Sequence, residues 1–109
     1  MNISPTLTFA RFYVLDLEQG ARRVGGRYFE TDNGYPFGIV HSIKSNVYTV
    51  YDLYNGLAVV DGCPSLSDAL DRFAAAYPKH DARVKSGALA KFADEFFELV
   101  GTDPVLCID

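Results

Sequence analysis

Hydrophobic and polar residues alternate through the first half of the chain, and one such alternating pattern occurs twice. Residues 12–26 and 48–62 match at six of fifteen positions, among them Asp16 and Asp52. Each copy predicts a β-strand, a two-residue turn ending in glycine and a returning strand, because glycine adopts the positive φ values that type I′ turns require. The chain is therefore predicted to form the same β-hairpin twice.

The predicted two-residue turns decide which side chains share a face of each hairpin, since directly opposed residues point the same way. In the first hairpin, Asp16 would lie opposite Arg23 on the solvent face, beside an exposed Val14. In the second hairpin, the core face would consist of Tyr51, Leu53, Ala58 and Val60. The solvent face would then carry Val50, Asp52, Tyr54, Leu57, Val59 and Asp61.

The residues between the two hairpins predict a central strand. An Asp-Asn-Gly turn signal at residues 32–34 and a polar turn at residues 44–46 bound a β-branched and aromatic segment, residues 35–43. Antiparallel strands with short connections lie beside their neighbours in the chain. The predicted outcome is a meander of five strands in sequence order.

Beyond the second hairpin the hydrophobic period changes from that of a strand to that of a helix. Ser65 is a candidate N-cap, and Pro78 is expected to end this first helix. A second helix would end at Gly101, and the tail over residues 105–108 is a candidate for a further strand. Two helices are thus expected to follow the meander.

The predicted fold class is α+β, a single domain over residues 1–109 in which a five-stranded antiparallel meander built from two similar hairpins carries two α-helices on one face. With 49% hydrophobic and 14% aromatic residues, the chain can bury a core without disulfides or metal. The N-terminal stretch lacks a basic n-region, and Arg11 interrupts its apolar run. We therefore expect neither a signal peptide nor a membrane span, and a cytoplasmic protein.

Charge and cysteine content argue against several classes of function. The net charge is −4, from 10 Lys and Arg against 14 Asp and Glu, which disfavours nonspecific binding of nucleic acid. Cys63 and Cys107 do not make a disulfide framework, and no Cys and His spacing is typical of a zinc site. We expect free thiols and no metal or cofactor.

Two residue pairs are candidates for catalysis. Asp52 and Asp61 would be diagonal neighbours on the solvent face of the second hairpin, but an open face offers no cleft to raise the pKa of a carboxyl. Cys63 precedes a helix, whose dipole lowers the pKa of a thiol, and His41 could serve as its base. The alternative interpretation of Cys63 is a buried, inert thiol. We therefore predict a noncatalytic protein, with a small thiol-dependent enzyme as the third hypothesis.

Three surfaces are candidates for binding. The solvent face of the second hairpin has the composition of a protein interface, unless a loop, the tail or a second subunit in a homodimer covers it. A basic run near the first turn offers a patch of Arg22, Arg23, Arg27 and Tyr28. The alternative interpretation of that run is an exposed ion pair between Arg23 and Asp16. The acidic face of the second helix is either solvated or a docking site, and consists of Asp94, Glu95 and Glu98.

The second hairpin and the helix after it form one recognisable segment. It contains Val50, Asp52, Gly56 and Val59, then Pro64, Ser65 and a helix rich in Ala, Leu and Phe up to Tyr77. The segment resembles the hairpin-then-helix module of many small accessory proteins of phages and plasmids. The resemblance implies an inhibitor of host defence, of the kind that anti-CRISPR proteins represent, and no particular target.

The leading hypothesis is therefore a noncatalytic, cytoplasmic protein-binding module that acts on a protein or nucleoprotein partner, as an inhibitor or accessory factor of a mobile element. The alternative hypothesis is a small-molecule or nucleic-acid binding protein that uses the basic hairpin patch. Because the chain is net acidic, nucleic acid is the less favoured partner.

Overall fold

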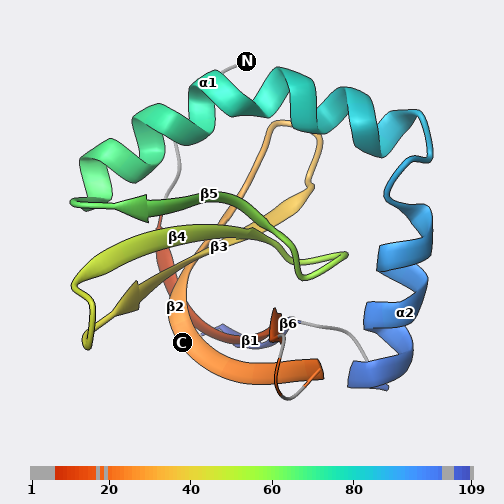
Figure 1. Ribbon diagram of the computed structural model, residues 1–109, viewed down its shortest axis with the longest axis horizontal. Helices are drawn as coiled ribbons and strands as arrows, with labels where there is room; N and C mark the ends of the chain where they lie inside the picture. The colour runs from red at the N-terminus through yellow and green to blue at the C-terminus, as the bar shows by residue number, and fades with distance from the viewer. Residues whose placement is uncertain (1–6, 17, 19, 102–104, 109) are drawn as a thin grey trace.

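The computed structural model describes residues 7–16, 18, 20–101 and 105–108, the last four by their backbone alone. Within them, the strands are β1 (Thr8–Asp16), β2 (Gly20–Glu30), β3 (Pro36–Ser42), β4 (Val47–Asp52), β5 (Ala58–Cys63) and β6 (Val105–Ile108), and the helices are α1 (Leu66–Lys85) and α2 (Ala90–Val100). The antiparallel sheet has the order β5-β4-β3-β2-β1-β6 (Figure 1). The predicted α+β meander followed by two helices is confirmed, and β6 extends the sheet beside β1.

The predicted turns and caps form where the local sequence favours them. Between β2 and β3, the Gly34 amide donates to the Thr31 carbonyl oxygen at 2.8 Å, and Gly34 takes a positive φ of 80°. Ser65 caps α1, because its hydroxyl accepts a hydrogen bond from the Asp68 amide at 3.0 Å. α2 ends at Gly101 in the left-handed conformation. These boundaries confirm the sequence-based prediction.

Pro78 does not end the first helix, as predicted, but lies inside α1, which continues well beyond it. Proline lacks an amide hydrogen, so it removes one helical hydrogen bond, at a cost of about 3 kcal/mol in a helix interior. Tertiary contacts on both sides of Pro78 offset this cost: Tyr77 packs edge-on to Phe37, and His80 hydrogen-bonds Asp52. The prediction was wrong because it used the local preference of proline alone.

Both faces of the central strands are buried. On the face that α1 covers, Phe73 of α1 lies edge-on to Phe29 and Phe37 of the sheet, with ring centroids 5.2 and 4.7 Å away. The cluster on this face consists of Phe29, Phe37, Ile39, Val50, Cys63, Ala69 and Phe73. The cluster on the opposite face consists of Ala10, Phe12, Val14 and Leu53. Apolar residues on both faces leave no alternating pattern from which the helix-covered face could be predicted.

α2 packs where the turns of the two hairpins meet. The Leu15 amide donates to the Gly56 carbonyl oxygen at 3.0 Å and so joins the end of β1 to the turn after β4. Phe96 of α2 is fully buried against Gly56, where a Cβ would lie only 2.6 Å from its ring. Among the described residues, no helix is both long and apolar enough to cross a membrane.

The first hairpin has a different register from the one predicted. Asp16 pairs with Gly20, so three residues, not two, lie between the paired positions. Arg23 therefore moves three positions away from Asp16, and an odd shift exchanges the two faces of a strand. Val14, predicted to be exposed, is fully buried, and Asp16 forms its ion pair with Arg22 at 3.2 Å instead of with Arg23.

The solvent face predicted for the second hairpin is wrong for two of its six residues. Val50 and Asp52 are fully buried, because the face that they occupy is the one α1 covers. Of the other four residues, Leu57 and Val59 are half-buried. Tyr54 and Asp61 are exposed. Register shifts on both sides of Val50 also break strict alternation between β4 and β5. The predicted apolar interface therefore does not form one continuous exposed face.

Candidate functional site

The cross-strand register places five side chains on one face of the β1–β2 hairpin. Phe9 lies opposite Arg27, Tyr13 lies opposite Arg23, and Arg11 lies between these two pairs along β1. Opposed residues, and alternate residues along a strand, point to the same side of a sheet. We call this surface the arginine face; it consists of Phe9, Arg11, Tyr13, Arg23 and Arg27.

The arginine face is open to solvent and partly ordered by its own contacts. Phe9 is 62% exposed, Arg11 and Arg23 are exposed, and Tyr13 and Arg27 are half-buried. The Arg27 guanidinium carbon lies 5.3 Å from the centroid of the Phe9 ring, within the range of a cation–π contact. This contact holds an apolar ring and a cation together at the surface.

A hollow lies between two of the arginines. Gly25 occupies the position opposite Arg11, and a Cβ there would meet nothing within 4 Å. The resulting shallow pocket of about 260 Å³ is lined by Arg11, Arg23, Val24 and Gly25. A small acceptor group, such as a carboxylate, can therefore approach both guanidinium groups from one side.

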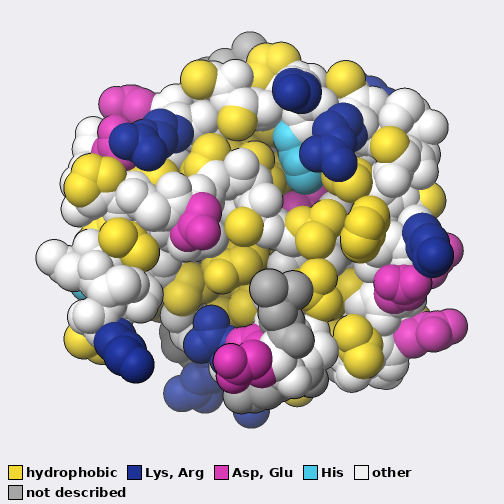
Figure 2. All heavy atoms as spheres, viewed as in Figure 1, with side chains coloured by type: hydrophobic (Ala, Val, Ile, Leu, Met, Phe, Trp, Pro, Cys, Tyr) yellow, Lys and Arg dark blue, Asp and Glu magenta, His cyan; other side chains and the backbone are white. Residues whose placement is uncertain are grey.

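The charge of the arginine face is not balanced within the described part of the chain. No carboxylate there forms an ion pair with Arg11, Arg23 or Arg27, whereas Arg22 of the same hairpin is paired with Asp16. In Figure 2 dark-blue side chains gather at the lower edge of the view, where Figure 1 places β1 and β2. A protein of net charge −4 thus presents a local positive surface.

No known relative helps to interpret this surface. Comparisons with protein-family models, curated proteins and solved structures give no match.

The basic patch predicted from the sequence is divided between two faces. Arg23 and Arg27 belong to the arginine face, whereas Arg22 and Tyr28 lie on the opposite face. There Arg22 pairs with Asp16, and the Tyr28 hydroxyl donates to Glu30 at 3.1 Å. The even-numbered members of the patch therefore have local partners, and the odd-numbered ones do not pair with a described carboxylate.

Sequence reasoning missed Phe9, Arg11 and Tyr13 as members of the site. The signal was present, since the three residues alternate along β1 with the period of two that places them on one face. It was hidden by the two-residue turn assumed for the first hairpin, which placed Arg23 opposite Asp16. With the observed register, Arg23 faces Tyr13 instead.

The predicted carboxylate pair is not assembled. Asp52 lies on the face that α1 covers. Asp61 accepts a hydrogen bond at 2.7 Å from Thr49, which lies on the opposite face, since the adjacent Val50 packs into the core under α1. Tyr54 is exposed and lies edge-on to Tyr35, with ring centroids 4.8 Å apart. The second hairpin thus offers isolated exposed residues and no paired acids.

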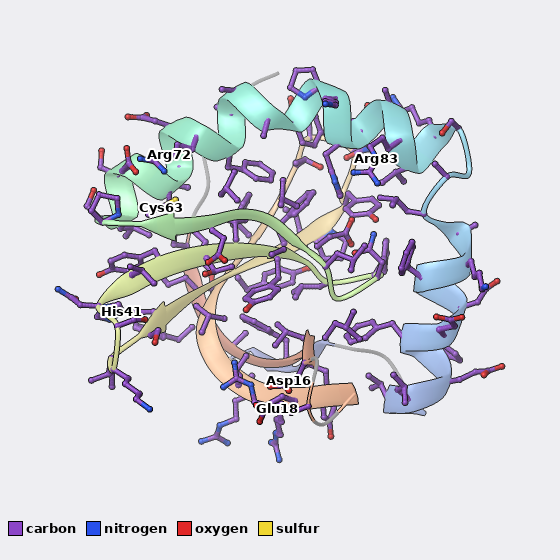
Figure 3. The ribbon with its side chains drawn as sticks, in the orientation of Figure 1. Asp16, Glu18, His41, Cys63, Arg72 and Arg83 are labelled. Carbon is purple, nitrogen blue, oxygen red and sulfur yellow. The ribbon has the colours of Figure 1, made fainter. Side chains whose placement is uncertain are left out.

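Cys63 and His41 lie apart in the fold. Tyr48 pairs with both residues and so separates them by a strand, and its ring stacks on His41 with centroids 4.4 Å apart. Cys63 is fully buried near the start of α1, and this burial raises the pKa of its thiol (Figure 3). A raised pKa lowers the nucleophilicity of a thiol at neutral pH. In the described part of the chain, no three His, Cys, Asp or Glu side chains gather closely enough to hold a metal ion.

Proposed function

We propose that the protein is a noncatalytic binding module that engages an acidic surface of a protein partner through the arginine face. The observation that carries this proposal is the group of three guanidinium groups that pair with no described carboxylate, beside the rings of Phe9 and Tyr13. Arg and aromatic side chains are enriched at the energetic centres of protein interfaces. Guanidinium groups bind carboxylates in a bidentate geometry, which makes Asp and Glu their natural complement.

The hairpin presents these anchors at a low entropic cost. Phe9 and Arg27 are already in contact in the free protein, so these two side chains lose less conformational entropy when a partner binds. The hollow at Gly25 gives a carboxylate access to Arg11 and Arg23 together. A rigid strand pair with prearranged cations supports specific recognition of an acidic segment.

Single-stranded nucleic acid is the second candidate ligand. The exposed Phe9 ring and the neighbouring Tyr13 could stack on bases while the arginines contact phosphates. Three arginines neutralise only about three phosphates, and the remaining chain is acidic enough to repel a polyanion beyond the hairpin. The protein partner is therefore the proposal that we favour.

The setting in which we place this module is the cytoplasm, as an inhibitor or accessory factor of a mobile element. That setting rests on the resemblance of the second hairpin and its helix to small phage and plasmid proteins. A compact sheet with a few strong anchors can occupy the acidic binding surface of a larger host protein.

Charge reversal on the arginine face tests the proposal. The wild-type protein, the double variant Arg11→Glu/Arg23→Glu and the control Arg72→Glu would each be immobilised and exposed to host lysate and to purified candidates. Arg72 lies on α1 and pairs with Asp68 at 2.8 Å, so the control changes an arginine outside the face. We expect a partner that is retained by the wild type and the control, is lost from the double variant and is released by salt.

Direct probes separate the two classes of partner. A peptide rich in Glu and Tyr should bind the wild-type protein and not the double variant, whereas an oligo-dT strand of the same charge should bind less tightly. Tighter binding of the oligonucleotide than of the peptide would identify the arginine face as a nucleic-acid binding surface. Retention of the protein partner by a folded double variant would overturn the proposal.

A further inference from the structure

A second pocket lies between β5 and the C-terminal half of α1. It has a volume of about 270 Å³ and is lined by Ala58, Val59, Ala75, Ala76, Lys79, His80 and Arg83. Figure 2 shows a histidine side chain in a hollow beside basic side chains, and Figure 3 places Arg83, one of the lining residues, on the C-terminal half of α1. Small apolar walls, one imidazole and two cations thus converge on one space.

The imidazole of this pocket is held in a fixed orientation. His80 is only 9% exposed, and its Nε2 donates to Asp52 Oδ2 at 2.7 Å. The same carboxylate oxygen accepts hydrogen bonds from the Tyr35 hydroxyl at 2.7 Å and from the Asn55 side chain at 3.1 Å. Oδ1 accepts from the backbone amides of Tyr54 and Asn55 at 2.8 and 3.2 Å. Since Nε2 is engaged, Nδ1 is the ring nitrogen that remains for a ligand.

The hydrogen bonds to Asp52 stabilise the fold, and they also fix the orientation of the His80 ring. Here five hydrogen bonds fix a fully buried carboxylate behind a histidine that lines a pocket. An oriented Asp–His pair of this kind is typical of binding and catalytic sites.

The cations at the rim differ from the other cations of α1. Arg72 pairs with Asp68 at 2.8 Å, and Lys85 pairs with Asp81 at 2.9 Å. Lys79 and Arg83, spaced four residues apart and therefore on one side of the helix, form no ion pair with any carboxylate that the structure describes. The unpaired cations of the helix are the two that border the pocket.

We propose that this pocket binds a small phosphate monoester. Arg83 and Lys79 would donate charge-assisted hydrogen bonds to the phosphate oxygens, and His80 Nδ1, which carries the lone pair when Nε2–H donates to Asp52, would accept a hydrogen bond from a hydroxyl group of the ligand. The alanine and valine walls would contact the organic part of the ligand. A volume of about 270 Å³ lies at the lower end of ligand pockets, so the ligand has few atoms beyond the phosphate.

The lining side chains also limit the chemistry. They include no Ser, Thr or Cys to attack the phosphorus atom, and the proposal assigns His80, whose Nδ1 is nucleophilic, a hydrogen bond to the ligand and no covalent role. The proposal is therefore binding, without a covalent step. The pocket and the arginine face use different elements, so this inference does not depend on the function proposed above.

Titration by ¹H–¹⁵N NMR tests the proposal, with ribose 5-phosphate and inorganic phosphate as probes and uncharged ribose as their matched control. We expect saturable shifts of the amides of residues 58–59, 75–77 and 79–83 with both phosphate probes and none with ribose. Arg83→Gln should weaken the affinity about tenfold or more, because it removes a charge-assisted hydrogen bond. The control Lys85→Gln removes a paired cation of the same helix and should change the affinity less than about twofold.

The outcomes are separable. No saturable shift with either phosphate probe, or equal weakening by Arg83→Gln and Lys85→Gln, would overturn the proposal. Arg11→Glu/Arg23→Glu should leave phosphate binding unchanged, so loss of the partner complex and loss of phosphate binding identify separate failures. Because the Arg83 side chain is exposed, its replacement should leave the core folded, so a loss of affinity reports on the pocket.

Discussion

The two hairpins share one sequence pattern but are buried differently. In the first hairpin one face packs against the core and the other remains open, with three arginines that pair with no described carboxylate. In the second hairpin α1 covers one face, and the face with Leu53 is buried as well. The second hairpin is followed directly by α1, whereas the first is followed by another strand. The next element along the chain, rather than the shared pattern, therefore determines which surface of each hairpin stays free.

The shared aspartate shows the same contrast. Asp16 lies at the surface and pairs with the exposed Arg22 across the hairpin. Asp52, at the equivalent position of the second copy, is fully buried and accepts hydrogen bonds from Tyr35 and His80. Asp52, turned toward a helix, belongs to a buried network, whereas Asp16 accepts at the surface from Arg22 and, at 2.8 Å, from the Glu18 amide.

The largest expected effect distinguishes these two aspartates. Asp52→Ala should lower the free energy of unfolding by about 3–5 kcal/mol, because it leaves buried donors without an acceptor. Asp16→Ala should lower it by less than about 1 kcal/mol, because its partner is solvent-exposed. Urea unfolding followed by circular dichroism measures both. Similar losses for the two variants would contradict the asymmetry.

Tyr35→Phe examines the network around Asp52 more gently. Loss of a hydrogen bond to a charged group should lower the free energy of unfolding by about 1.5–3 kcal/mol at neutral pH. Burial, and then the hydrogen bond to Asp52, raise the pKa of Tyr35. The folded state therefore favours the neutral phenol, and the stability from this group is present below the unfolded value of about 10 and lost as the pH rises above it.

The pH dependence supplies the control for Tyr35→Phe. Between about pH 9 and pH 11, the wild-type protein should lose stability that the variant does not lose, as Tyr35 ionises only in the unfolded chain. Parallel stability curves for the two proteins over this interval would show that the Tyr35 hydroxyl is not buried against Asp52.

Two adjacent glycines distinguish the two faces of the first hairpin. Gly26→Ala should lower the free energy of unfolding by about 1–3 kcal/mol, because its methyl group would collide with the Ile39 carbonyl oxygen and lie 2.9 Å from the Phe12 ring. At Gly25 the same change meets nothing within 4 Å and should have little effect. Thermal unfolding compares the two, and an equal loss for Gly25→Ala would place a packed layer over the arginine face.

Local signals in the sequence were enough to predict the order of elements. The turn at Gly34, the N-cap at Ser65 and the stop at Gly101 depend on residues within a few positions of one another. The end proposed at Pro78 failed because contacts from Tyr77 and His80 to the sheet outweigh the lost helical bond. Those contacts join residues far apart in the chain, which a periodic pattern does not encode.

The candidate sites were harder to predict for the same reason. The sequence identifies Arg23 and Arg27 as basic, but their grouping with Arg11 depends on the register of the hairpin, whose shift by three positions exchanges the two faces. His80 gave no local signal, because its partner Asp52 lies 28 residues away. Composition identifies the reactive side chains, and only register and helix packing bring them together.

The smallest expected effect tests the register of the first hairpin directly. Arg22→Ala should lower the free energy of unfolding by about 0.5 kcal/mol, because it removes a cross-strand ion pair with Asp16 whose partners are 3.2 Å apart and partly exposed. Arg23→Ala should change it by less than that, since Arg23 pairs with no described carboxylate, although it should weaken binding of an acidic partner. Urea unfolding at low and high salt measures both, and salt should reduce only the Arg22 effect. If Arg23→Ala were instead the more destabilising and the more salt-sensitive change, Arg23 would face Asp16 across a two-residue turn, and the arginine face would not exist in solution.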